Sequence, residues 1–239
     1  MAASNATAHV LIVESLRDII SSCKKIGSSY DPEYPEIRIP ALESQLALTE
    51  YHQLVVKDKV NVFYHISNER TGLYAGLPSL CNRLLQVLAD MPMPADTFRK
   101  AAAINVIIQE TRLYKNFSIA QYEAQSGTGS NALPGRSYEQ LEHCFAQLVE
   151  IIATFGNTYQ PEDIELQYPV LCDYRVKLSR SNRLIQHALA EVNMARQQRN
   201  ELLPVLAATH RQLHKKVHTY LRKSFGVSSW QFRQAKLKS

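Results

Sequence analysis

The residues best placed to do chemistry are three histidines in the stretch THRQLHKKVHTY, residues 209–220. His210, His214 and His218 follow one another at intervals of four. Side chains four residues apart lie on one face of a helix, and two histidines at that spacing can chelate Zn²⁺, Ni²⁺ or Cu²⁺. All three cannot share one ion, because eight residues of helix rise about 12 Å. The spacing therefore keeps open a metal site at His210 and His214.

The surroundings of these histidines favour a structural role instead. Apolar residues such as Leu213 and Val217 mark the buried face of the predicted helix. His210 falls inside that face, His214 at its edge and His218 beyond it. The stretch also contains three basic residues and no Asp or Glu, so its charge would repel a cation. Metal binding is accordingly the second of two alternative functions.

Other catalytic patterns are missing from the sequence. Glu139 and His143 stand alone at a spacing of four, whereas a di-iron carboxylate site needs Glu-x-x-His pairs from several helices. The GTGSN stretch at residues 127–131 has neither the strand nor the Lys-Ser/Thr of a phosphate-binding loop. No GxSxG motif and no nucleophile–base pair is recognisable. We predict that the chain is not an enzyme and uses no cofactor.

Basic residues are concentrated at the C-terminal end. Residues 175–239 hold 14 Lys and Arg against two acids, and residues 1–174 hold 13 against 20. Such a segment attracts an acidic protein surface or a nucleic acid, or it faces the acidic part of its own chain or of a second subunit. The candidate anion- or partner-binding residues are Arg211, Lys215, Lys216, Arg222, Lys223 and Arg233.

A 17-residue motif that occurs twice in the sequence indicates the helices that position these residues. IGSSYDPEYPEIRIPAL at residues 26–42 matches FGNTYQPEDIELQYPVL at residues 155–171, at a constant offset of 129. Each copy follows an amphipathic helical stripe and carries a Gly suited to the left-handed position after a helix. Each also has a Pro that fits the first turn of the next helix. The stripes are Ile12, Leu16, Ile19, Cys23 and Ile26, and Leu141, Phe145, Leu148, Ile152 and Phe155.

After each phrase the pattern predicts a long helix and then a third helix. We expect breaks at Thr71–Gly72 and near Glu201–Pro204, third helices over residues 77–90 and 205–224, and a further helical piece in each half. Residues 124–137 have the Gly/Ser/Asn/Pro composition of a linker. The predicted fold is all-α, with two tandem, antiparallel, four-helix-bundle-like repeats (1–123 and 138–239) related by an internal pseudo-two-fold.

The second half resembles an uncharacterised bacterial family of helical-bundle proteins with tandem repeats. VNMARQQRN at 192–200 and LHKKVHTYLRKSFGVSSWQFRQAKLK at 213–238 carry the resemblance, and ERTGLYAGL at 69–77 is similar to the family's helix-break segment. The second half departs from the family in having ELLPVL in place of that break. The resemblance implies a helical bundle and carries over no activity, cofactor or catalytic residue.

The composition also bears on the location of the protein and on its function. We expect no secretory signal, and no apolar run reaches the roughly 20 residues that span a bilayer. Its four cysteines are far apart, which indicates reduced thiols and a cytoplasmic location without membrane attachment. We predict a non-enzymatic helical scaffold or protein-interaction module that binds a protein partner or itself. The first alternative is a nucleic-acid-associated protein that uses the basic C-terminal helix and tail.

Overall fold

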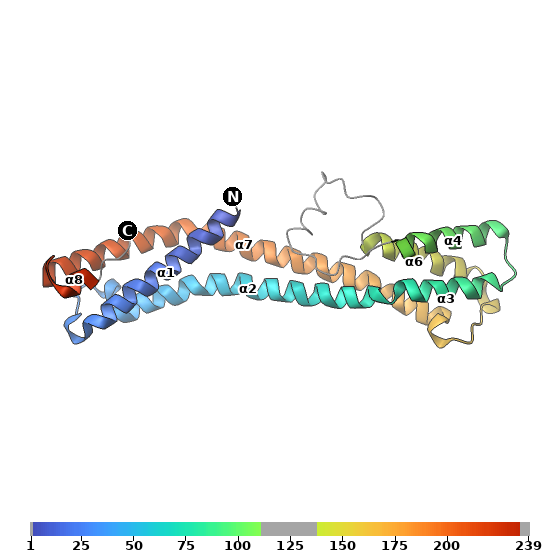
Figure 1. Cartoon of the computed structure of the whole chain (residues 1–239), viewed down its shortest axis with the longest axis horizontal. Helices are drawn as coiled ribbons and strands as arrows, with labels where there is room; N and C mark the ends of the chain where they lie inside the picture. Colours follow the sequence, from blue (N-terminus) through green and yellow to red (C-terminus); the bar gives the residue numbers. More distant parts are fainter. Residues whose placement is uncertain (1, 111–137, 235–239) are drawn as a thin grey trace. The chain divides into compact units, whose positions relative to one another are not determined.

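A computed structural model describes residues 2–110 and 138–234, and throughout them the regular elements are helices, without strands (Figure 1). This confirms the predicted all-α class. The predicted linker, residues 124–137, lies outside the described residues. The α-helices are α1 (Ala2–Ile26), α2 (Ile39–Ala75), α3 (Leu77–Ala89), α4 (Ala95–Glu110), α6 (Tyr138–Ala153), α7 (Tyr168–Phe225) and α8 (Trp230–Gln234). Short 3₁₀ helices cover Gly27–Ser29, Pro35–Ile37, Gly156–Thr158 and Ile164–Leu166.

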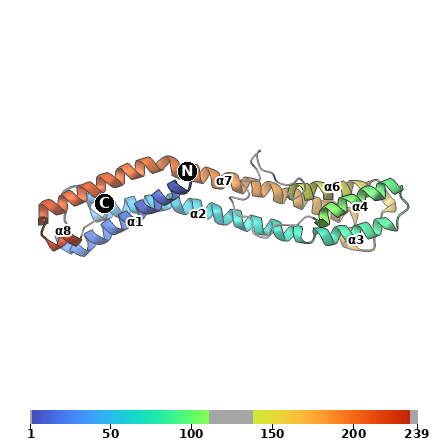
Figure 2. The same ribbon diagram turned by 45° about the horizontal axis from the view of Figure 1, so that its top comes forward.

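The helices form two compact units. Unit 1 comprises Met1–Val60 and Glu191–Ser239, and unit 2 comprises Asn61–Ala190. In both views of the ribbon α1 lies alongside the first part of α2 (Figures 1 and 2). Each unit takes segments from both halves of the sequence. The predicted tandem division at residues 124–137 falls outside the described residues and stays a prediction.

The core of unit 1 confirms the predicted stripe of α1. All five residues of the stripe are buried, and they pack with the turn after α1 and with the last part of α7. The α7 residues stand four apart, which places them on one face of the helix. This core therefore joins residues about 180 positions apart in the chain. Its central members are Leu16, Ile19, Cys23, Ile37, Leu42, Leu213, Val217 and Leu221.

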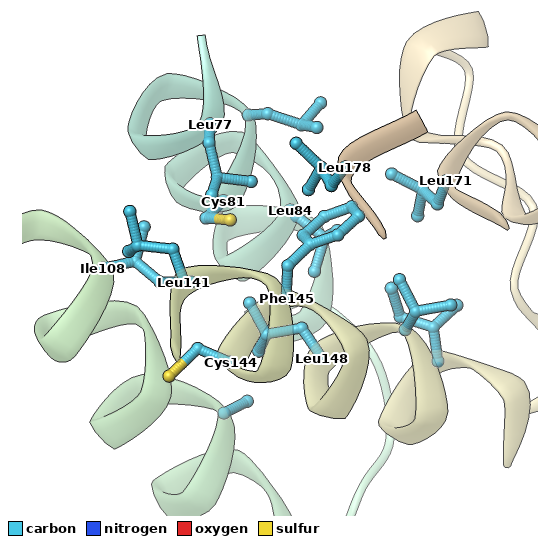
Figure 3. Packing of buried hydrophobic residues seen from close by; sticks show 14 of the residues in the cluster. Leu77, Cys81, Leu84, Ile108, Leu141, Cys144, Phe145, Leu148, Leu171 and Leu178 are labelled. Carbon is cyan, nitrogen blue, oxygen red and sulfur yellow. The ribbon is translucent and has the colours of Figure 1, made fainter. Parts of the chain in front are cut away.

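The core of unit 2 is built around α6. Four of the five predicted stripe residues of α6 are buried, and Phe155 is partly buried. The Phe145 ring points toward Leu84 of α3 and Leu178 of α7 (Figure 3) and meets the Tyr174 ring edge-on at 5.4 Å. Cys81 is buried in the same cluster, and burial raises its thiol pKa to about 12. It therefore packs as a small apolar residue.

The predicted third helix of the first half is confirmed as α3, but the first predicted helix break is misplaced and the second is wrong. Helix α2 continues through Thr71–Gly72 and ends only at Ala75, and α7 runs unbroken for 58 residues with Pro204 inside it. A helical Gly costs about 1 kcal/mol relative to Ala, and an interior Pro costs about 3 kcal/mol. Buried residues on both sides outweigh these costs, such as Tyr74 after Gly72 and Leu206 after Pro204. The predicted third helix over 205–224 is thus the end of α7.

Candidate functional site

The turn between α1 and α2 is a rigid platform within unit 1. Gly27 ends α1 at φ +69°, a left-handed conformation that glycine adopts without a steric penalty. The buried Tyr30 donates its hydroxyl to the carbonyl oxygen of Ile37 at 2.7 Å and so closes the turn. Arg38 Nε donates to the carbonyl oxygen of Pro32 at 3.2 Å. These local bonds fix the backbone of residues 30–38.

Three contacts hold this turn against α7. The Tyr30 ring meets the Tyr220 ring edge-on, with centroids 5.3 Å apart. The backbone N–H of Asp31 donates to the Tyr220 hydroxyl oxygen at 3.2 Å, and Lys216 Nζ pairs with Glu36 Oε1 at 2.5 Å. The hydrogen bond from Lys216 holds the pKa of the Glu36 carboxyl below its ordinary value. The docked turn and the helix together form one surface.

Between the turn and α7 lies a groove of about 730 Å³, called the α7 groove here. The turn contributes Asp31, Glu33 and Tyr34, and the Tyr34 side chain is 58% exposed. Lys215 and Lys223 form no ion pair within the described residues, and their spacing of eight places them on one side of the helix. The turn wall is thus acidic and the helix wall basic. The helix wall consists of Gln212, Lys215, Lys216, Thr219, Tyr220, Lys223 and Ser224.

The structure brings together only half of the predicted partner-binding residues. Lys215, Lys216 and Lys223 line the groove. Arg211 Nε instead donates to the carbonyl oxygen of Ala207 in its own helix, at 3.3 Å. The remaining two also lie outside the groove lining: Arg222 is exposed, and Arg233 Nη2 donates to the carbonyl oxygen of Ser228 at 2.6 Å.

The acidic and aromatic part of the groove was missed from the sequence. Asp31, Glu33 and Tyr34 all lie in the first copy of the repeated phrase, residues 26–42, which the sequence identified as the connection between two helices. The turn packs on Tyr220, which is 189 residues from Asp31 in the sequence. No local pattern encodes a contact over that separation.

His210 lies on the α1 side of α7, and His218 lies on the tail side. His210 Nε2 lies 2.8 Å from Ser15 Oγ, and the His218 ring lies 4.9 Å from the Phe232 ring. Burial lowers the pKa of His210 and of His214, which favours neutral rings near pH 7. Within residues 2–110 and 138–234 no group of three or more His, Cys, Asp or Glu is arranged to hold a metal ion. A metal site at His210 and His214 stays a prediction.

Comparisons of the chain with family models, curated proteins and solved structures found no match. None of the described helices is both long and apolar enough to cross a membrane. We therefore infer function from the geometry of the α7 groove.

Proposed function

We propose that the chain is a non-enzymatic helical scaffold, and that the α7 groove binds a second copy of the same chain. One observation carries this proposal: the two walls of the groove have opposite charge, and the turn wall also carries the exposed aromatic side chain of Tyr34. A partner for this surface needs both acidic and basic groups and an apolar contact. A protein surface supplies all three.

A second copy is the partner whose charges match this pattern directly. In a two-fold interface the same patch is present on both subunits. Lys215 and Lys223 of one copy then face Asp31 and Glu33 of the other, and the reverse holds at the same time. Tyr34 adds an aromatic ring, a residue type that is enriched at protein interfaces.

Nucleic acid is the alternative, and the groove itself argues against it. A phosphate backbone carries charge of one sign, so it is attracted to Lys215 and Lys223 and repelled by Asp31 and Glu33. Arg222 and Arg233 lie outside the groove, away from the acidic side chains of its lining. A nucleic acid would therefore track the helix surface and the tail rather than fill the groove.

The proposal includes an internal repeat, as the sequence phrase and the resemblance to helical-bundle proteins suggest. Two likenesses support it. Gly27 and Gly156 are both left-handed, and Tyr30 and Tyr159 both bond to a carbonyl seven residues on, at 2.7 and 2.8 Å. In each unit the turn from one sequence half packs with the third helical segment of the other half. Two related halves would thereby exchange their third segments within one chain.

Sedimentation velocity of the full chain over a concentration series tests the self-association. We expect a reversible dimer that weakens at high salt, because exposed charge pairs are screened. Lys215→Glu/Lys223→Glu and Asp31→Lys/Glu33→Lys should each weaken the dimer by about tenfold or more, since like charges then face each other. The four changes combined restore opposite charges and should restore the dimer. The matched control, Lys57→Glu/Lys100→Glu, reverses two exposed lysines elsewhere.

Two results decide against the proposal. A wild-type chain that stays monomeric at every concentration and salt removes the second copy as the partner. Fluorescence anisotropy with labelled DNA and RNA then tests the alternative. Binding that falls steeply with salt, and is lost in Arg222→Glu/Arg233→Glu, would assign the basic surface to nucleic acid.

A further inference from the structure

A layer of four basic side chains crosses unit 1 at a distance from the α7 groove. His9 comes from α1, His52 from α2, and Arg196 and Arg199 from α7. Arg199 precedes Lys215 by about 24 Å of helix. His9 interacts electrostatically with Arg199 and His52, and Arg199 interacts with Arg196, which places the members of each pair within electrostatic range of each other. These interactions among the four are repulsive when the groups are charged.

Burial makes this layer unusual. His9 is 1% exposed and Arg199 is 9% exposed. Neither ring nitrogen of His9 has a hydrogen-bond partner of good geometry in the described part of the chain, although the nearby Gln53 side chain favours the protonated ring. Burial, followed by the charges of Arg199 and His52, lowers the pKa of His9. A neutral imidazole is thus held inside the unit, with no hydrogen bond of good geometry at either ring nitrogen.

Arg199 has no carboxylate partner in the described residues. Its Nε and Nη2 both donate to Asn200 Oδ1, at 3.3 and 2.9 Å. A neutral amide oxygen does not balance the charge of a guanidinium. Buried arginines in proteins are ordinarily paired with an anion, because taking an unpaired charge out of water is costly.

We propose that this layer, His9, His52, Arg196 and Arg199, is a binding site for a small doubly charged oxoanion such as phosphate or sulfate. The planar Arg199 guanidinium can match two oxygens of such an anion with parallel N–H groups, in exchange for its bonds to Asn200 Oδ1. Protonation turns both ring nitrogens of the nearby His9 into donors. His52 and Arg196 are half-buried and form the solvent side of the layer, from which the anion enters.

An anion site that is empty should lower the stability of the fold. Without an oxoanion, the buried Arg199 charge opposes folding, so Arg199→Met should not lower the melting temperature in chloride buffer. A polar layer that only holds the helices in register would behave in the opposite way. Its arginine would stabilise the fold, and the same substitution would lower the melting temperature. The substitution conserves side-chain length and apolar stem, so packing changes little.

Calorimetric melting of the full chain in sulfate tests the site. Sulfate is chosen because its charge is the same at pH 6 and pH 8, and sodium chloride keeps the ionic strength constant. The wild-type melting temperature should rise and saturate at millimolar sulfate, because an anion that binds only the folded state stabilises it. The rise should be larger at pH 6, because protonated His9 and His52 join Arg196 and Arg199 in holding the anion. A parallel series with phenyl phosphate distinguishes a free oxoanion from a phosphate ester.

The matched control is Arg222→Met, an exposed arginine on the same helix. It should respond to sulfate like the wild type, whereas Arg199→Met should lose the saturable rise. Sulfate also stabilises proteins generally by exclusion from their surface, but that effect does not saturate and is equal in all variants. Equal responses in wild type and Arg199→Met overturn the proposal. If Arg199→Met does not fold, the Arg199 Nε–H signal of the wild type decides by NMR, since a signal that sulfate does not shift also overturns it.

Discussion

The turn of unit 1 and the turn of unit 2 have the same backbone and different electrostatics. Both follow a left-handed Gly, contain two 3₁₀ helices, and are closed by a buried Tyr hydroxyl. In unit 1 the acid Glu36 pairs with Lys216. In unit 2 the equivalent acid, Glu165, shares Arg83 with Asp163, which lies 2.7 Å from Arg83 Nη1. A guanidinium binds two carboxylates at once, while an ammonium acts as a point charge.

The helix that faces each turn shows where the difference lies. Leu80, Leu84 and Leu88 pack beneath the second turn, and Leu213, Val217 and Leu221, each 133 residues later, pack beneath the first. At the same offset, Lys215 corresponds to Asn82 and Lys223 to Asp90. The apolar positions that build the platform are thus alike, while the two unpaired lysines occur in unit 1 alone. The fold does not require those lysines, which supports a binding role for them.

The largest expected effect concerns the apolar anchor of each turn. Ile37 and Leu166 are buried at equivalent positions, so Ile37→Ala and Leu166→Ala should each lower the free energy of unfolding by about 2–5 kcal/mol. The two losses in free energy are measured by urea unfolding, with hydrogen exchange used to monitor each unit separately. An effect on one unit at least twice that on the other would contradict the equivalence of the two platforms.

The tyrosine clamp should give the next largest effect. Tyr30→Phe and Tyr159→Phe keep the ring and leave the carbonyl oxygens of Ile37 and Leu166 without a donor. We expect a loss of about 1–2 kcal/mol in each case, because a buried acceptor loses its hydrogen bond. Tyr168→Phe, at an exposed position next to the second turn, is the control and should cost little. Equal losses in the control and in the two clamp variants would show that the tyrosine hydrogen bonds do not stabilise the turns.

Glycine substitutions test the backbone of the turns. Gly27→Ala and Gly156→Ala force a side chain into the left-handed region and should each cost about 1 kcal/mol. Gly72→Ala is the matched control, because Gly72 lies within helix α2 and a Cβ there meets no atom within 4 Å. That substitution should stabilise the chain by up to about 1 kcal/mol. The opposite signs are checked by thermal melting of the three variants, and a stabilising Gly27→Ala would refute the left-handed turn.

Local patterns in the sequence predicted the elements of this fold and the turns. The stripes of α1 and α6, the left-handed glycines, and Pro40 and Pro169 in the first turns of α2 and α7 were all read correctly, because each depends on neighbours within a few residues. The positions of the two helix breaks were predicted wrongly. Gly72 and Pro204 weaken a helix locally, and buried residues around them decide the outcome.

The site was predictable only on its basic side. Lys215, Lys216 and Lys223 were selected by their spacing on one helix, which is local information. The acidic wall at Asp31 and Glu33 lies about 180 residues away in the chain, and only the folded core brings it to α7. The layer at His9 and Arg199 was invisible for the same reason, since its four members are dispersed over nearly 200 positions.

The smallest effect, and the finest test of the difference between the turns, concerns the pKa of Glu36. The hydrogen bond from Lys216 lowers this pKa below its ordinary value of 4.5. The pair therefore stabilises the fold above about pH 4.5, and the contribution is lost as the pH falls through the lowered pKa. Lys216→Gln should return the pKa of Glu36 toward 4.5, measured by NMR titration, and should shift the melting temperature only slightly, because exposed ion pairs contribute little. Arg83→Gln, the corresponding change in unit 2, should leave the pKa of Glu36 where it is. If Lys216→Gln leaves it unchanged as well, the turn of unit 1 is held by its apolar and tyrosine contacts alone, and the lysines of the α7 groove are then all available to a partner.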